Sequence, residues 1–86
     1  MMRILRTERF RKDFRRLPEQ IQVRLGKALE LLVSDPRHRS LRVKKMEGTP
    51  DLWELRVSDN YGVTFQHEPE GVLLRRVGTH DALRRP

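Results

Sequence analysis

The chain has 86 residues, which predicts one domain with a thin hydrophobic core. It contains no cysteine, so disulfide frameworks, thiolate catalysis and cysteine-based zinc sites are excluded. No apolar run approaches the roughly 20 residues of a membrane-spanning helix.

The net charge is +7, and 15 arginines plus 4 lysines make up the 19 cations. Guanidinium groups bind phosphate oxygens in pairs and stack on bases, so this composition indicates contact with nucleic acid or with an acidic protein. The alternative is that arginine usage reflects codon bias or a hot-living source. The first residues, Met1 to Arg6, are too short and too charged for a secretory signal, so we expect a cytoplasmic protein without membrane contact.

The first half of the chain predicts one short strand and two helices. Residues 3–6 can form the strand, and Thr7 stands where a helix N-cap is expected. Apolar residues at helical spacing predict a basic helix over 8–17 and, after Pro18, a second helix over 19–33. The apolar positions are Phe10, Phe14 and Leu17 in the first helix, and Ile21, Leu25, Ala28, Leu29 and Leu32 in the second.

The second half predicts strands separated by turn residues. Residues 41–46 form an uneven candidate strand, and 52–57, 61–67 and 72–80 alternate apolar and polar residues. The order of elements predicts an α+β domain over residues 1–86. In it, an N-terminal strand and a helical hairpin pack on a small antiparallel sheet.

If consecutive strands pair as hairpins, the alternation gives the sheet an apolar face and a polar face. Leu74 and Arg75 break the alternation. The apolar face collects Trp53, Leu55, Val57, Tyr61, Val63, Phe65, Leu73 and Val77, which we take as core. The polar face collects Glu54, Arg56, Thr64, Gln66, Arg76 and His80, which we take as the candidate site.

The polar face offers one imidazole, one carboxylate and several cations, and no second ligand for a metal. This set suits metal-independent cleavage of RNA by its own 2′-hydroxyl, in which cations hold the phosphate and an acid protonates the 5′-oxygen. His80 is the candidate acid or base, unless it is an ordinary surface histidine. Glu54 is either a base or an ion-pair partner of Arg56. Arg56 and Arg76 are either phosphate cations or solvated and paired side chains.

Five strings in order resemble the RelE and ParE superfamily of toxins, specifically its RelE-like side with YoeB and YafQ. They are Asp35-Pro36 after the helices, Leu41 to Gly48, Leu52 to Val57, Asn60 to Phe65, and Leu73 to Asp81. The resemblance covers nearly the whole chain. It implies a type II toxin that acts as a ribosome-dependent mRNA endonuclease and inhibits translation without a cofactor. It also implies neutralisation by a cognate acidic antitoxin, through which alone operator DNA would be bound.

The resemblance also implies roles for individual residues. His80 lies where relatives place a catalytic His or Arg, and Arg56 lies where they place a cation that binds mRNA. Glu54 falls beside Arg56, with its role left open. The RNA-binding candidates are Lys44, Lys45, Arg84 and Arg85.

Two positions depart from the family pattern. Gly62 replaces an Arg that supports the transition-state phosphate, and Arg84 replaces a Tyr or Phe. Losing one such cation typically costs about a hundred- to a thousand-fold in rate. Three explanations of Gly62 are open. Another cation takes the place of the Arg, the toxin is naturally weakened, or Gly62 is an attenuating substitution. The rival function is a ParE-like inhibitor of DNA gyrase, or a silent toxin that mainly binds its antitoxin.

Overall fold

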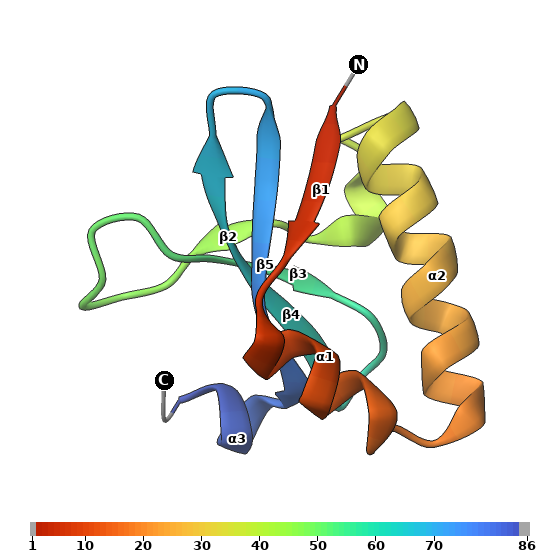
Figure 1. Cartoon of the computed structure of the whole chain (residues 1–86). Helices are drawn as coiled ribbons and strands as arrows, with labels where there is room; N and C mark the ends of the chain where they lie inside the picture. Colours follow the sequence, from red (N-terminus) through yellow and green to blue (C-terminus); the bar gives the residue numbers. More distant parts are fainter. Residues whose placement is uncertain (1, 85–86) are drawn as a thin grey trace.

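The computed structural model describes residues 2–84, which form an α+β fold (Figure 1). The elements are β1 (Arg3–Arg6), α1 (Glu8–Arg15), α2 (Glu19–Ser34), a 3₁₀ turn (Arg39–Leu41), β2 (Lys44–Lys45), β3 (Trp53–Arg56), β4 (Tyr61–Glu68), β5 (Gly71–Thr79) and α3 (His80–Leu83). None of the helices in residues 2–84 is long and apolar enough to span a membrane.

The two predicted helices are confirmed. Thr7 caps α1, because its hydroxyl oxygen accepts a hydrogen bond from the backbone N–H of Phe10 at 3.0 Å. Pro18 precedes the first turn of α2, and α2 ends at Ser34 before the predicted Asp35-Pro36 stop. The helices do not lie side by side along their length. Figure 1 shows α1 crossing one end of the sheet and α2 running beside it.

The strands form one sheet in the order β1-β5-β4-β3-β2. Strands β2 to β5 pair antiparallel, as predicted, whereas β1 is parallel to β5, with Arg3 opposite Gly71. The sheet is therefore mixed rather than wholly antiparallel. A parallel pair needs a long connection, and here most of the chain separates its two strands.

A β-bulge explains why Leu74 and Arg75 break the alternation. Thr64 pairs with Arg76 and Phe65 pairs with Leu74, so Arg75 has no partner on β4. The extra residue reverses the facing of β5 before the bulge. Leu74 is therefore fully buried, while Leu73, predicted to face the core, is only half-buried.

The core lies between the apolar face of the sheet, α2 and one residue of α1. Trp53 and Tyr61 pack against it while partly exposed, as their parity predicts. Its buried members are Phe10, Leu25, Leu29, Leu32, Leu41, Leu55, Val57, Val63, Phe65, Val72, Leu74 and Val77.

Helix α1 covers the edge of β5 where β1 ends. The hydroxyl of Thr7 donates to the carbonyl of Arg75 at 2.9 Å, and the carboxylate of Asp13 accepts from the backbone N–H of Val77 at 3.3 Å. These bonds satisfy backbone groups that an uncovered strand edge would expose. They also fix α1 beside the end of β5 from which His80 follows.

Candidate active site

His80 is the first residue of α3 rather than the last residue of a strand. Thr79 ends β5 and caps α3, because its hydroxyl oxygen accepts from the backbone N–H of Ala82 at 3.3 Å. The backbone N–H of His80 donates to the carbonyl of Asn60 at 3.2 Å. The turn between β3 and β4 and the end of β5 thus fix the backbone that carries the imidazole.

Both ring nitrogens of His80 face oxygen acceptors. Nδ1 lies 2.8 Å from Oε2 of Glu54, and Nε2 lies 3.2 Å from the carbonyl oxygen of Asp59. A carboxylate and a carbonyl can only accept, so both hydrogen bonds form together only when the ring is the doubly protonated imidazolium. The His80 side chain is 41% exposed and that of Glu54 is 10% exposed, so the ring is accessible while its carboxylate partner is covered.

Glu54 reaches His80 across Gly62, the position where the family pattern has Arg. The space that a side chain at residue 62 would take is occupied, because the Glu54 carboxylate lies over this glycine. An ideal Cβ at residue 62 would stand 2.5 Å from Oε2 of Glu54.

One groove joins His80 and Glu54 to the predicted RNA-binding residues Lys44, Lys45 and Arg84. Its volume is about 900 Å³, and it lies between the β2–β3 connection and α3. Figure 1 shows that connection extending on the same side of the sheet as α3. The side chains of Lys44, Lys45 and Arg84 are exposed and form no ion pair with another residue in 2–84, so their charge faces the groove or solvent.

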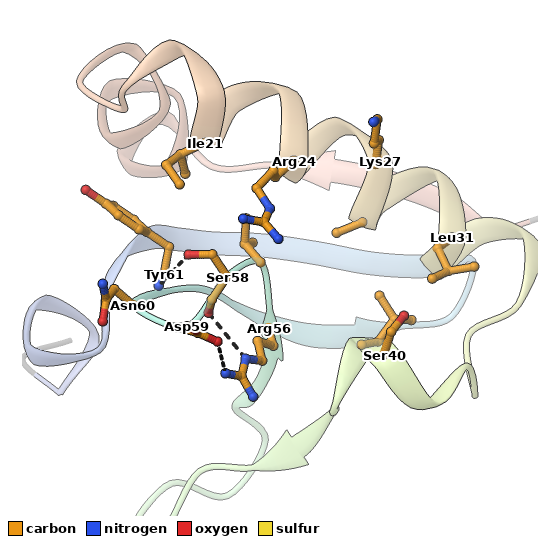
Figure 2. A pocket seen from close by; sticks show the side chains of 13 residues that line it. Ile21, Arg24, Lys27, Leu31, Ser40, Arg56, Ser58, Asp59, Asn60 and Tyr61 are labelled. Atoms are coloured by element: carbon orange, nitrogen blue, oxygen red, sulfur yellow. Dashed lines mark hydrogen bonds and ion pairs between the residues drawn. The ribbon is translucent and has the colours of Figure 1, made fainter.

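Arg56 lies in a different groove, of about 540 Å³, between α2 and the β3–β4 turn (Figure 2). Its guanidinium binds the carboxylate of Asp59 and, at 3.4 Å, the carbonyl of Ser58. Tyr61 and the helix cations Arg24 and Lys27 line the same groove. Arg56 therefore stabilises the β3–β4 turn. The link from Arg56 to the imidazole is indirect and runs through Asp59, whose carboxylate binds Arg56 and whose carbonyl faces His80.

Arg76 is tied to the fold. Its Nε lies 3.1 Å from the carboxylate of Asp13 on α1, and its Nη1 donates to the carbonyl of Ala82 on α3 at 3.3 Å. The side chains of Arg76 and Asp13 are only 17% and 14% exposed. Of the two alternatives that the sequence left open for Arg76, phosphate cation or paired side chain, the structure shows the pairing, which joins α1 and α3 to the sheet.

Sequence reasoning missed Asp13, Asp59 and helix α3. Asp13 belongs to a helix, so strand alternation could not connect it with Arg76. Asp59 acts through its backbone carbonyl, which carries no side-chain signal. Arg85 lies outside the described residues. Within residues 2–84, no three His, Asp or Glu side chains gather closely enough to hold a metal ion.

The fold and the polar groove define a toxin of the RelE and ParE superfamily. Residues 4–83 match the model of the ParE toxin family of the type II toxin–antitoxin system parDE. The chain belongs to this family, as the match covers nearly all of it. No curated protein matches the chain significantly.

Solved structures share the fold at low sequence identity. The RelE–RelB complex from Methanococcus jannaschii matches with a TM-score of 0.76 and 22% identity, covering 93% of this chain and 94% of that one. YafQ from Escherichia coli BL21(DE3) matches with a TM-score of 0.79 and 16% identity, covering 96% and 98%. A YoeB/ParE toxin from Agrobacterium tumefaciens matches with a TM-score of 0.75 and 10% identity, covering 92% and 99%.

Proposed function

We propose that this toxin is a ribosome-dependent mRNA endonuclease that cleaves without a metal. The observation that carries the proposal is the half-exposed His80, bonded to a covered Glu54 and opening into the groove lined by Lys44, Lys45 and Arg84. A surface histidine without a role needs neither a buried carboxylate partner nor a cationic groove. Acting on the ribosome places the protein in the cytoplasm.

In the proposed reaction, an RNA strand lies in the groove with its phosphate held by the unpaired cations. The 2′-oxygen attacks phosphorus and loses its proton to water, while the bond from phosphorus to the 5′-oxygen breaks. The Nε2–H of His80, which faces the carbonyl of Asp59 in the structure, leaves that oxygen and donates its proton to the departing 5′-oxygen. The products are a 2′,3′-cyclic phosphate and a 5′-hydroxyl. Glu54 orients the imidazolium, because its carboxylate is covered and bonded to Nδ1.

The test is cleavage of mRNA on programmed ribosomes by wild type and His80→Ala. Loss of the acid lowers the rate by about a hundred- to ten-thousand-fold. His38→Ala is the matched control, since His38 is an exposed histidine outside this groove. We expect this variant to keep full activity. Equal cleavage by wild type and His80→Ala would exclude His80 as the acid.

The family match supports a second candidate function, inhibition of DNA gyrase by a ParE-like toxin. The two candidates differ in what His80 does, because gyrase inhibition requires no proton transfer to RNA. A supercoiling assay with stoichiometric protein separates them. Inhibition that survives His80→Ala, with no mRNA cleavage by wild type, would favour gyrase.

The chain's partner in the proposed system is an acidic antitoxin, and solved toxin–antitoxin complexes of similar fold contain RelB and DinJ. A groove of about 410 Å³ between α1 and α2 suits an acidic amphipathic helix. Its apolar lining is Phe10, Phe14, Leu25 and Leu29, and its cationic lining is Arg6, Arg11 and Arg15.

Gly26 provides a direct test of this antitoxin groove. It lines the groove on α2, and a Cβ built there meets no atom within 4 Å. Gly26→Trp places a large side chain in the groove and is expected to weaken antitoxin binding by about tenfold or more, whereas Gly26→Ala binds nearly as well as wild type. The measurement is titration calorimetry with the proposed acidic antitoxin. Equal affinity of the Trp variant would remove the groove from the interface.

A further inference from the structure

We propose that Gly62 is a positioning residue, whose missing side chain leaves the space in which Glu54 holds His80. The catalytic consequence rests on the proposed function, while the geometric claim is independent of it. On this proposal, Gly62 is neither an empty place nor a defect. The absence of a side chain at residue 62 is what allows the Glu54 carboxylate to bind the His80 ring.

The geometry identifies one atom as the point of conflict. Oε2 of Glu54 accepts the hydrogen bond from Nδ1 of His80 at 2.8 Å, and the same Oε2 would lie 2.5 Å from a Cβ at residue 62. Heavy atoms without a hydrogen bond between them do not approach so closely, so a methyl group at residue 62 excludes the observed carboxylate position. The carbonyl of Leu55, 3.1 Å from that Cβ, prevents the new side chain from moving the other way.

The Glu54 carboxylate must shift to make room for that Cβ, and two features limit where it can go. Its side chain is 10% exposed, and its strand position is fixed by pairing with Lys44 on β2 and Thr64 on β4. A displaced carboxylate therefore leaves Nδ1 without its acceptor. The ring then keeps only the carbonyl of Asp59, which does not hold the imidazole in one orientation.

Gly78 provides a matched comparison. It lies directly opposite Gly62 on β5, in the same row of the sheet. A Cβ at Gly78 would meet only the methyl of Ala82, at an ordinary contact distance of 3.5 Å. The same Gly→Ala change on neighbouring strands thus conflicts with the carboxylate at residue 62 and with nothing at residue 78.

The first test uses nuclear magnetic resonance of protein labelled with nitrogen-15 in histidine. Wild type and Gly78→Ala show the His80 Nδ1–H proton, protected by its bond to Glu54. Gly62→Ala and Glu54→Ala lose that signal. Retention of the protected proton in Gly62→Ala would overturn the proposal, whatever reaction the protein catalyses.

A second test removes the conflict instead of the bond. With Glu54→Ala already present, Gly62→Ala has no carboxylate to displace, so it causes no further change in the His80 signals. Any further fall in melting temperature then reports the contact of the new Cβ with the Leu55 carbonyl, 3.1 Å away. The double variant also keeps the proposal testable if Gly62→Ala alone folds poorly. If the clash with Glu54 is the cause, the double variant regains the melting temperature of Glu54→Ala. Failure of the double variant to recover would show that Gly62 is needed for another reason.

Activity gives the third measurement. Gly62→Ala lowers mRNA cleavage by about tenfold to a hundredfold, a loss shared with Glu54→Ala and not doubled when the two are combined. Gly78→Ala cleaves like wild type. Gly62→Arg also lowers the rate, because its Cβ meets the same oxygen. An increase with Gly62→Arg would restore the interpretation of Gly62 as an attenuating loss. If wild type does not cleave RNA at all, the resonance test still decides the geometric claim.

Discussion

Two side chains of the polar face, Arg76 and His80, are each paired with a carboxylate, and the two pairs differ in their exposure to solvent. Asp13 and Arg76 are both nearly covered, at 14% and 17% exposure, while in the second pair Glu54 is covered and His80 is 41% exposed. The first pair joins α1, β5 and, through Ala82, α3. A pair closed on both sides holds elements together, whereas a pair open on one side leaves the imidazole oriented and accessible.

Breaking the closed pair is expected to have the largest effect on stability. Asp13→Ala leaves the Arg76 guanidinium without its carboxylate and removes the acceptor for Val77 N–H, which destabilises the fold by about 3 kcal/mol. Glu54→Ala at the open pair costs about 1 kcal/mol, since water can replace the carboxylate at His80. Chemical denaturation measures both. Equal losses would show that exposure does not separate the pairs.

The second largest effect is expected from an uncharged residue that holds the Glu54–His80 pair in place. Leu83 is 2% exposed and fixes α3, the helix that begins at His80, so Leu83→Ala costs about 2 kcal/mol. We expect mRNA cleavage to fall along with the melting temperature, because the imidazole loses its fixed backbone. Val23→Ala, at a residue 55% exposed on α2, is the control and changes neither. Full cleavage by Leu83→Ala would separate α3 from the site.

The groove beside the open pair is expected to show smaller, salt-dependent effects. Lys44 lies opposite Glu54 in the sheet register, so Lys44→Ala removes about one phosphate contact and lowers the salt slope of single-stranded RNA binding by about 0.7. Lys45 lies opposite Trp53, on the other parity, and Lys45→Ala has the weaker effect. Fluorescence anisotropy across a salt series measures the slopes. Lys12→Ala on α1, outside the groove, should leave the slope unchanged.

The smallest effect on stability is expected from an ion pair in which both side chains are exposed. Arg3 and Glu70 lie 2.9 Å apart with side chains 65% and 68% exposed. Screening by water and salt reduces such a pair to a few tenths of a kcal/mol, so Glu70→Gln changes the unfolding free energy by less than about 0.5 kcal/mol. The same denaturation experiment measures it. A loss near that of Asp13→Ala would contradict the ranking by exposure.

Sequence reasoning predicted what depends on periodicity. Alternation in residues 52–57 and 61–67 placed Leu55, Val63 and Phe65 in the core, and spacing of four placed Leu25 and Leu29 there. The same alternation put Glu54 and His80 on one face, where the structure brings them into contact. These successes follow from the fixed geometry of strands and helices, which a single sequence reveals.

What sequence reasoning could not predict depends on contacts between distant elements. Nothing in the local pattern of Arg76 distinguishes a guanidinium bound to Asp13 from one that is free to bind phosphate. The occupied space over Gly62 is equally hidden, since it depends on where the Glu54 carboxylate ends in three dimensions. The bulge at Arg75 left a trace in the sequence, as a break in alternation, but the break alone does not say which residue is extra.

The parallel pairing of β1 with β5 also orders events in the making of the protein. Within residues 2–84, β1 precedes the other strands along the chain and pairs with β5, which follows them, so this sheet cannot be completed until residues 71–79 are available. Pairing of such distant segments is slow, because loop-closure entropy is lost before the contacts form. His80 follows directly after that last strand. The chain therefore places His80 and closes its sheet in the same late step.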